Sequence, residues 1–207
     1  MTPVRERYAA LVRRLGSSGD PGAAADALLA AWAHPSRIYH GTGHLVDCLA
    51  CLDGEPGDVV ERDLIEAALW YHDAVYDPRA ADNEERSAVR ARQELVGLGV
   101  AFHKGENVAR LIRLTRHGEP PTDVSGMILC DIDLSILGRP PAEFDAYDAG
   151  IRAEYAWLPD DAFGKGRRRV LTRLLSRRFL YGTERFRRRY ESRARANLRR
   201  AVARLGG

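Results

Sequence analysis

Apolar residues recur along the chain at intervals of three and four, the spacing that places them on one face of an α-helix. Strand-like alternation is almost absent, and β-branched residues are too sparse for repeated strands. The pattern predicts helices over residues 4–15, 23–33, 43–52, 60–76, 83–97, 104–117, 124–137, 141–156, 161–180 and 184–204. We therefore expect an all-α fold.

Glycine and proline residues separate these segments at even intervals, and none of the breaks has the composition of an interdomain linker. A chain of 207 residues is of ordinary length for one domain with one core. We predict a single domain over residues 1–207, a helical bundle extended by basic C-terminal helices over about 161–205.

Hydrophobic residues make up 45% of the chain and charged residues 29%, which is typical of soluble globular proteins and excludes disordered and fibrous classes. No window approaches eighteen uninterrupted apolar residues, and arginines interrupt the apolar N-terminal stretch, so we expect no membrane span and no signal peptide. Three cysteines cannot all pair within one chain. These features favour a cytoplasmic protein with no membrane partner.

The net charge of +3 hides an asymmetry along the chain. Residues 165–207 hold sixteen Lys or Arg against Glu184 and Glu191, a net charge of +14, which leaves −11 for the rest. Such a segment either binds nucleic acid or forms a solvated helix face whose arginines pair with acidic residues. We favour the second interpretation, and a homodimer is also compatible with the sequence.

The first candidate for chemistry is the stretch 64–78, LIEAALWYHDAVYDP, which is apolar on nearly every helical face until His72 and Asp73. Carboxylates are rarely buried unless they are paired or bind a metal, so Asp73 requires a partner. If the helix continues to Pro78, Asp77 lies on the same side as Asp73, one turn later. Asp77 is then the candidate general acid or base.

Two further stretches carry ionisable side chains. In RIYHGTGHL, residues 37–45, His40 and His44 are four positions apart, a spacing that is more often structural than ligating. In MILCDIDLSILG, residues 127–138, Asp131 and Asp133 lie about 200° apart around a helix, so both can hardly face one site. The helix face that contains Asp133 is slightly more apolar than the face that contains Asp131.

The ordered set of RxxH, HD and a later DxD resembles the HD-domain superfamily over about residues 37–138. The surrounding HDAVYDP, DNEERSA and DIDLSILG are similar to a bacterial branch of predicted metal-dependent phosphohydrolases. The resemblance implies an all-helical site that binds one divalent metal ion. The ligands that it implies are His40, His72, Asp73 and Asp133, with Asp131 as the alternative to Asp133.

That site would hydrolyse a small phosphate ester or anhydride, with a nucleotide among the candidate substrates, by attack of metal-activated water. Mixed nitrogen and oxygen ligands favour a transition metal over Mg²⁺, and Mn²⁺, Co²⁺, Fe²⁺, Mg²⁺ and Zn²⁺ all stay open. Arg37 and Arg116 are candidates for binding the substrate phosphate. The candidate catalytic residues are Asp77, His44 and Glu84, although Glu84 more often serves as a first-turn residue.

Other readings remain open. Tyr76 stands where nucleotidases of the superfamily have a glutamate, so a nucleoside monophosphate is not supported by that position. His103 and His117 could serve a second metal ion in an iron oxygenase or hydratase. Another rival is an inert, metal-stabilised scaffold whose basic tail binds nucleic acid. We interpret Cys48 and Cys51 as core thiols.

Overall fold

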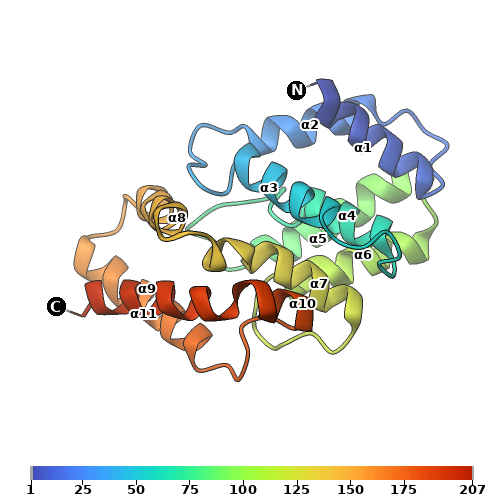
Figure 1. Cartoon of the computed structure of the whole chain (residues 1–207). Coiled ribbons are helices and arrows are strands. Elements are labelled where there is room, and N and C mark those ends of the chain that lie inside the picture. The colour runs from blue at the N-terminus through green and yellow to red at the C-terminus, as the bar shows by residue number, and fades with distance from the viewer. Residues whose placement is uncertain (1, 207) are drawn as a thin grey trace. The chain divides into compact units, whose positions relative to one another are not determined.

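The computed structural model describes residues 2–206, and every regular element in that range is a helix (Figure 1). The prediction of an all-α fold is therefore confirmed. The chain forms two compact units, Met1–Leu129 and Cys130–Gly207. A single domain over the whole chain stays a prediction. No helix within the described range combines the length and the apolar character that a membrane span needs.

The first unit is built around one central helix. Its elements are α1 (Thr2–Arg14), α2 (Gly22–Trp32), α3 (Thr42–Asp53), α4 (Arg62–Tyr71), α5 (Asn83–Gly97), α6 (Phe102–Leu114) and the first part of α7 (Val124–Asp133). Helix α4 packs against α1, α3, α5 and α6, and its residues from Ile65 to Tyr71 are all buried. Burial on every side explains why this stretch is apolar apart from Glu66, which pairs with Arg7 and Arg14 of α1.

Helix α4 ends at Tyr71, five residues earlier than the predicted helix over 60–76. The amides of His72 and Ala74 still bond to the carbonyls of Ala68 and Tyr71, and after Ala74 side chains supply partners for the backbone. The amide of Val75 donates to Ser87 Oγ at 3.0 Å, and the amide of Asp77 donates to Asn83 Oδ1 at 3.1 Å. Because α5 supplies these partners, the chain turns away after His72 and Asp73 without leaving buried polar groups unsatisfied.

The second unit holds the basic end of the chain. After the end of α7 it contains the 3₁₀-helix η1 (Leu134–Gly138), α8 (Pro141–Glu154), α9 (Asp160–Leu175), α10 (Glu184–Phe186), the π-helical turn η2 (Arg187–Glu191) and α11 (Ser192–Arg204). Helix α11 packs against α9 and η1. The predicted helix over 161–180 ends at Leu175, where Arg195 of α11 donates to the carbonyls of Leu175 and Arg177 at 3.0 and 2.8 Å.

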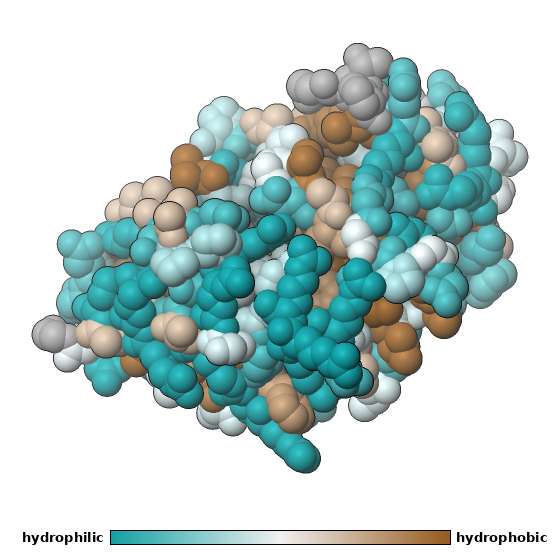
Figure 2. All heavy atoms as spheres, in the orientation of Figure 1, coloured by the Kyte–Doolittle hydropathy of each residue, from teal (hydrophilic) through white to brown (hydrophobic). Residues whose placement is uncertain are grey.

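Part of the basic segment pairs with acidic residues of α8. Arg167 and Arg204 pair with Asp148, and Arg200 and Arg204 pair with Asp145. Other arginines of this segment are exposed, namely Arg168, Arg169, Arg178, Arg189, Arg193 and Arg199. Figure 2 shows hydrophilic residues over the surface of α11. Pairing with acidic residues therefore accounts for some of the +14 charge, and the remainder faces solvent.

Candidate metal centre

Two helices of the first unit bring histidines together. Gly41 is extended at φ −107° and ψ −167°, and α3 begins at the next residue. A Cβ at Gly41 would lie 3.1 Å from the carbonyl oxygen of Arg37, so glycine permits this close approach. His44 therefore lies in the first turn of α3, whereas His40 precedes the helix. Because α3 packs against α4, His44 meets His72, which directly follows α4.

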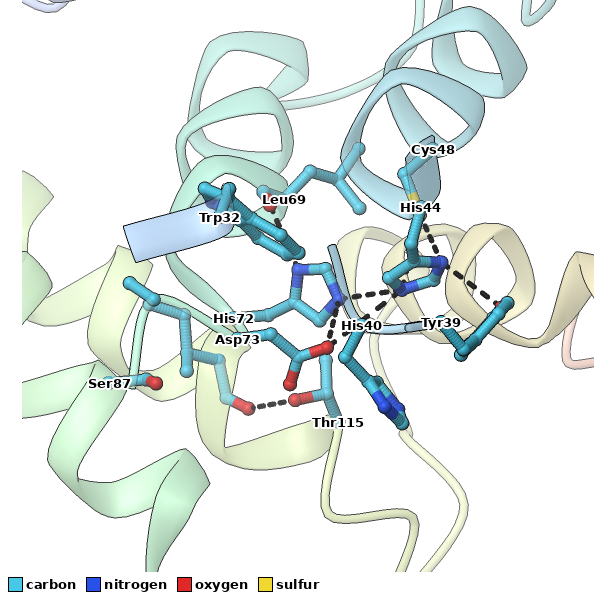
Figure 3. A network of polar contacts seen from close by, with 12 residues as sticks. Trp32, Tyr39, His40, His44, Cys48, Leu69, His72, Asp73, Ser87 and Thr115 are labelled. Carbon is cyan, nitrogen blue, oxygen red and sulfur yellow. Dashed lines mark hydrogen bonds and ion pairs between the residues drawn. The ribbon is translucent and has the colours of Figure 1, made fainter. Parts of the chain in front are cut away.

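The imidazoles of His44 and His72 point toward one another (Figure 3). Their Nε2 atoms are 3.1 Å apart, and the rings are buried with exposed fractions of 5% and 1%. The carboxylate atom Asp73 Oδ2 lies 3.3 Å from His72 Nε2 and 3.9 Å from His44 Nε2. Three ligand atoms of the first unit therefore converge on one small volume.

The hydrogen bonds around the two rings suit metal binding. Nδ1 of His72 lies 2.9 Å from the Leu69 carbonyl oxygen, which can only accept, so Nδ1 carries the proton and Nε2 offers a lone pair. Nδ1 of His44 lies 3.1 Å from the hydroxyl of Tyr39, which can accept a hydrogen bond from it. Such partners on the far nitrogen orient metal-binding histidines. Two nitrogens bound to one ion at about 2.05 Å are about 2.9 to 3.3 Å apart, so the observed spacing fits.

Cys48 lies beside the two histidines, one turn after His44 on α3. One ligand atom from each of His44, Cys48 and His72 lies within 4.8 Å of the others, a spacing at which the three could hold a metal ion. The sequence interpretation had placed Cys48 among the core thiols, and its burial with an exposed fraction of 2% agrees with that. The missed signal was the spacing of four between His44 and Cys48 on a predicted helix.

The turn that carries Asp73 is held by arginines. Arg37 donates to the carbonyl oxygens of Asp73 at 2.5 Å, His40 at 3.3 Å and Ala74 at 3.4 Å. Arg90 of α5 also donates to the Ala74 carbonyl, at 3.2 Å. The guanidinium N–H groups of Arg37 that form these bonds point toward the backbone of the turn. This placement favours a positioning role for Arg37 over the predicted contact with substrate phosphate.

Aromatic rings enclose the Arg37 guanidinium. Its central carbon lies 5.6 Å from the centre of the Trp32 ring and 5.5 Å from that of Tyr76. The Trp32 ring also lies 5.4 Å from the His72 ring, and its Nε1 donates to the Trp70 carbonyl at 3.0 Å. Cation–π contacts of this kind hold a guanidinium in one place. Tyr76 thus packs against the Arg37 guanidinium.

A network of hydrogen bonds between two buried tyrosines and an ion pair stabilises the turn that carries Asp73. The hydroxyls of Tyr8 and Tyr71 lie 2.6 Å apart, Tyr71 donates to Glu94 at 2.9 Å, and Arg90 donates to Glu94 at 2.7 Å. Burial raises the pKa of Tyr8 to about 12 and raises that of Tyr71 further, so both phenols stay protonated. The network fixes Arg90, which in turn holds the Ala74 carbonyl.

His40 lies to the side of the cluster. Its ring stacks on Tyr76 with centroids 4.3 Å apart. The centroid of the His40 ring lies 6.0 Å from that of His44, and both residues are labelled in Figure 3. The structure thus brings His44, and not His40, against His72. His40 as a ligand stays a prediction from the family resemblance, while the geometry favours His44 in that role.

Two predicted helper residues lie at the border between the turn and α5. Because α4 ends at Tyr71, the helical spacing that placed Asp77 beside Asp73 does not hold. Asp77 is exposed, and its Oδ1 accepts a hydrogen bond from the Arg79 amide at 2.9 Å. Glu84 lies in the first turn of α5, where a carboxylate interacts favourably with the positive end of the helix dipole.

The remaining candidates of the first unit lie around α6. Arg116 is exposed just past the end of this helix. His103 lies in the first turn of α6 and His117 follows its last turn, so the helix separates the two by roughly 20 Å. They therefore cannot serve the same second metal ion.

Asp131 and Asp133 belong to the second unit. The Asp131 carboxylate accepts hydrogen bonds from the amides of Gly182 and Thr183 at 2.6 and 2.8 Å and from the Thr183 hydroxyl at 2.7 Å. Burial raises the pKa of Asp131 to about 6, while the bonds from Thr183 and Gly182 lower it. Asp133 ends α7 and is half-buried. Because Asp131 holds the loop before α10, Asp133 is the better candidate ligand, and this role stays a prediction.

Comparison with known proteins does not place the chain in a family. No protein-family model, curated protein or solved structure matches it. The convergence of His44, His72 and Asp73 is therefore the main guide to function.

We expect His44→Ala to weaken metal binding at least about tenfold and His40→Ala to weaken it less than about threefold, because only the Nε2 atom of His44 meets that of His72. Isothermal titration calorimetry of the metal-free variants with Zn²⁺ measures both affinities. A larger loss in His40→Ala than in His44→Ala would contradict the geometric assignment and support the ligand that the resemblance implies.

Proposed function

We propose that the protein is a metal-dependent phosphohydrolase of the HD type. The single observation that carries this proposal is the convergence of His44 Nε2, His72 Nε2 and Asp73 Oδ2, since HD is the doublet on which the resemblance rests. Ionisable groups buried together require a shared proton or an ion. The orientation of both Nδ1 atoms toward partners supports an ion.

In this proposal His44, His72 and Asp73 of the first unit hold the ion, and Asp133 as a further ligand stays a prediction from the family resemblance. When bound, the ion supplies a Lewis acid for the phosphoryl oxygen and lowers the pKa of bound water toward neutrality. Two imidazoles and one carboxylate leave coordination positions for water and substrate. A donor set of mixed nitrogen and oxygen fits this chemistry.

The chain itself positions these ligands. Arg37 and Arg90 fix the turn that presents Asp73, and the Leu69 carbonyl and the Tyr39 hydroxyl orient the imidazoles. Fixed ligands avoid the cost of reorganising the site during the reaction. Arg116 stays a candidate for binding the substrate phosphate, since it is exposed just past α6. Proton transfer by Asp77 stays a prediction from the sequence, since the end of α4 at Tyr71 removes the helical spacing that placed it beside Asp73.

The test is metal-dependent release of inorganic phosphate. Purified protein is analysed for bound metal, stripped with a chelator and assayed with p-nitrophenyl phosphate and a panel of nucleotides, before and after addition of Mn²⁺, Co²⁺ or Zn²⁺. We expect about one equivalent of metal per chain and phosphate release only from the reloaded protein. Phosphate release that is equal with and without metal, or none from any substrate in a fully loaded protein, would overturn the proposal.

A further inference from the structure

The thiol of Cys48 occupies a chemically distinct position among the buried cysteines. Its Sγ atom lies 3.8 Å from both Nδ1 and Nε2 of His44 and within 4.8 Å of the ligand nitrogen of His72 (Figure 3). Cys51 is also buried on α3, but it is absent from the group of potential metal ligands found among the described residues. A thiol in an apolar core is inert, whereas a thiol beside an ion is readily deprotonated.

The measured separation suits a sulfur and a nitrogen on one ion. Bonds of about 2.3 Å to sulfur and about 2.05 Å to nitrogen in a tetrahedral site place the two atoms about 3.6 Å apart. The distance from Cys48 Sγ to His44 Nε2 is 3.8 Å. Sγ is equally far from His44 Nδ1, so we expect it to shift toward the Nε2 side of the ring when the ion binds. His44 and Cys48 lie four positions apart on α3, so one helix face presents both donors.

We propose that Cys48 binds the ion as a thiolate together with His44 and His72. The inference rests on the metal site of the proposed function and concerns which ion that site takes. Binding replaces the thiol proton by the metal, and the proton is released to solvent. A thiolate with two imidazoles selects Zn²⁺, Co²⁺ or Fe²⁺, whereas Mg²⁺ and Mn²⁺ prefer oxygen ligands. The natural ion is therefore a thiophilic one, and Mg²⁺ is a poor substitute.

Cobalt spectroscopy tests the proposed bond directly. The metal-free full-length chain is titrated with Co²⁺, and the near-ultraviolet absorption band that arises from sulfur-to-cobalt charge transfer is recorded beside the visible bands of the bound ion. We expect the charge-transfer band in the wild type and in Cys51→Ser, the matched control from the same helix. We expect Cys48→Ser to lose the band and to bind Zn²⁺ at least about tenfold more weakly, with Mn²⁺ affinity nearly unchanged.

The outcomes separate this inference from the proposed function. Visible cobalt bands in the wild type without a charge-transfer band would show that Cys48 is not a ligand, and the metal site would stand. If no Co²⁺ or Zn²⁺ binds the wild type, both proposals fail. Circular dichroism checks that Cys48→Ser is folded, and Cys48→Ala serves as a second variant if the hydroxyl disturbs the packing. A charge-transfer band that persists in a folded Cys48→Ala would also overturn the inference.

Discussion

Asp73→Ala is expected to lose the bound ion and to lower metal-dependent turnover by at least about a thousandfold. The carboxylate lies 3.3 Å from His72 Nε2 and is the only acidic side chain of the HD doublet. Removing it takes away the negative charge that the doublet contributes, which weakens the electrostatic attraction to the divalent ion. Several kcal/mol of transition-state stabilisation depend on that ion, and each 1.4 kcal/mol corresponds to about tenfold in rate.

Elemental analysis and a phosphate-release assay measure the two parts of this prediction on the same preparation. Asp47→Ala is the matched control, because Asp47 is exposed on α3, outside the cluster. It is expected to keep its metal and its turnover. Metal content at the wild-type level in a folded Asp73→Ala would show that Asp73 is not a ligand.

Arg37→Ala is expected to weaken metal binding by up to about a hundredfold, although Arg37 touches no ion. Its guanidinium donates to the carbonyls of Asp73 and Ala74, and the substitution leaves these groups in a part-buried turn without those donors. The turn then relaxes, and the Asp73 carboxylate loses its fixed place. Lysine has a single compact charge in place of the planar fork, so Arg37→Lys is expected to fall between the wild type and Arg37→Ala.

The measured quantities are the metal dissociation constant, KM and the free energy of unfolding. If Arg37 positions the turn, metal affinity falls in Arg37→Ala. If it binds substrate phosphate, as the sequence suggested, KM rises while metal affinity stays at the wild-type level, and the positioning role is wrong. Arg86→Ala is the control, since Arg86 is exposed on α5 and lies 3.9 Å from Asp82 of the preceding turn.

Helical periodicity predicted most elements because the buried face of an amphipathic helix appears in the sequence as apolar residues three and four positions apart. The predicted helix over 83–97 matches α5 at both ends. The predictions failed where a helix ends against a side chain that is distant in sequence. Ser87 and Asn83 supply the partners that let the chain leave the helical path after Tyr71, and Arg195 does the same after Leu175.

The sequence also pointed to the chemistry of the site, through an HD doublet at the end of an apolar helix. The family resemblance assigned the ligand role to His40 and left His44 among the catalytic candidates, because the helical spacing of the two histidines does not separate them. The start of α3 at Thr42 places only His44 on the helix. Cys48 was interpreted as a core thiol because its position beside His72 depends on the packing of α3 against α4.

By itself, the sequence determined an all-α chain, most of the helical segments, the basic C-terminal segment with its acidic remainder, and a candidate metal motif. These features are local, since periodicity and residue type act over a few turns. Only the tertiary structure decided that His44 meets His72, that Arg37 holds the turn of Asp73 and that Asp131 binds the loop before α10. Each of these contacts joins segments far apart in the chain. The packing of buried helices determines these contacts, and no local sequence pattern predicts that packing.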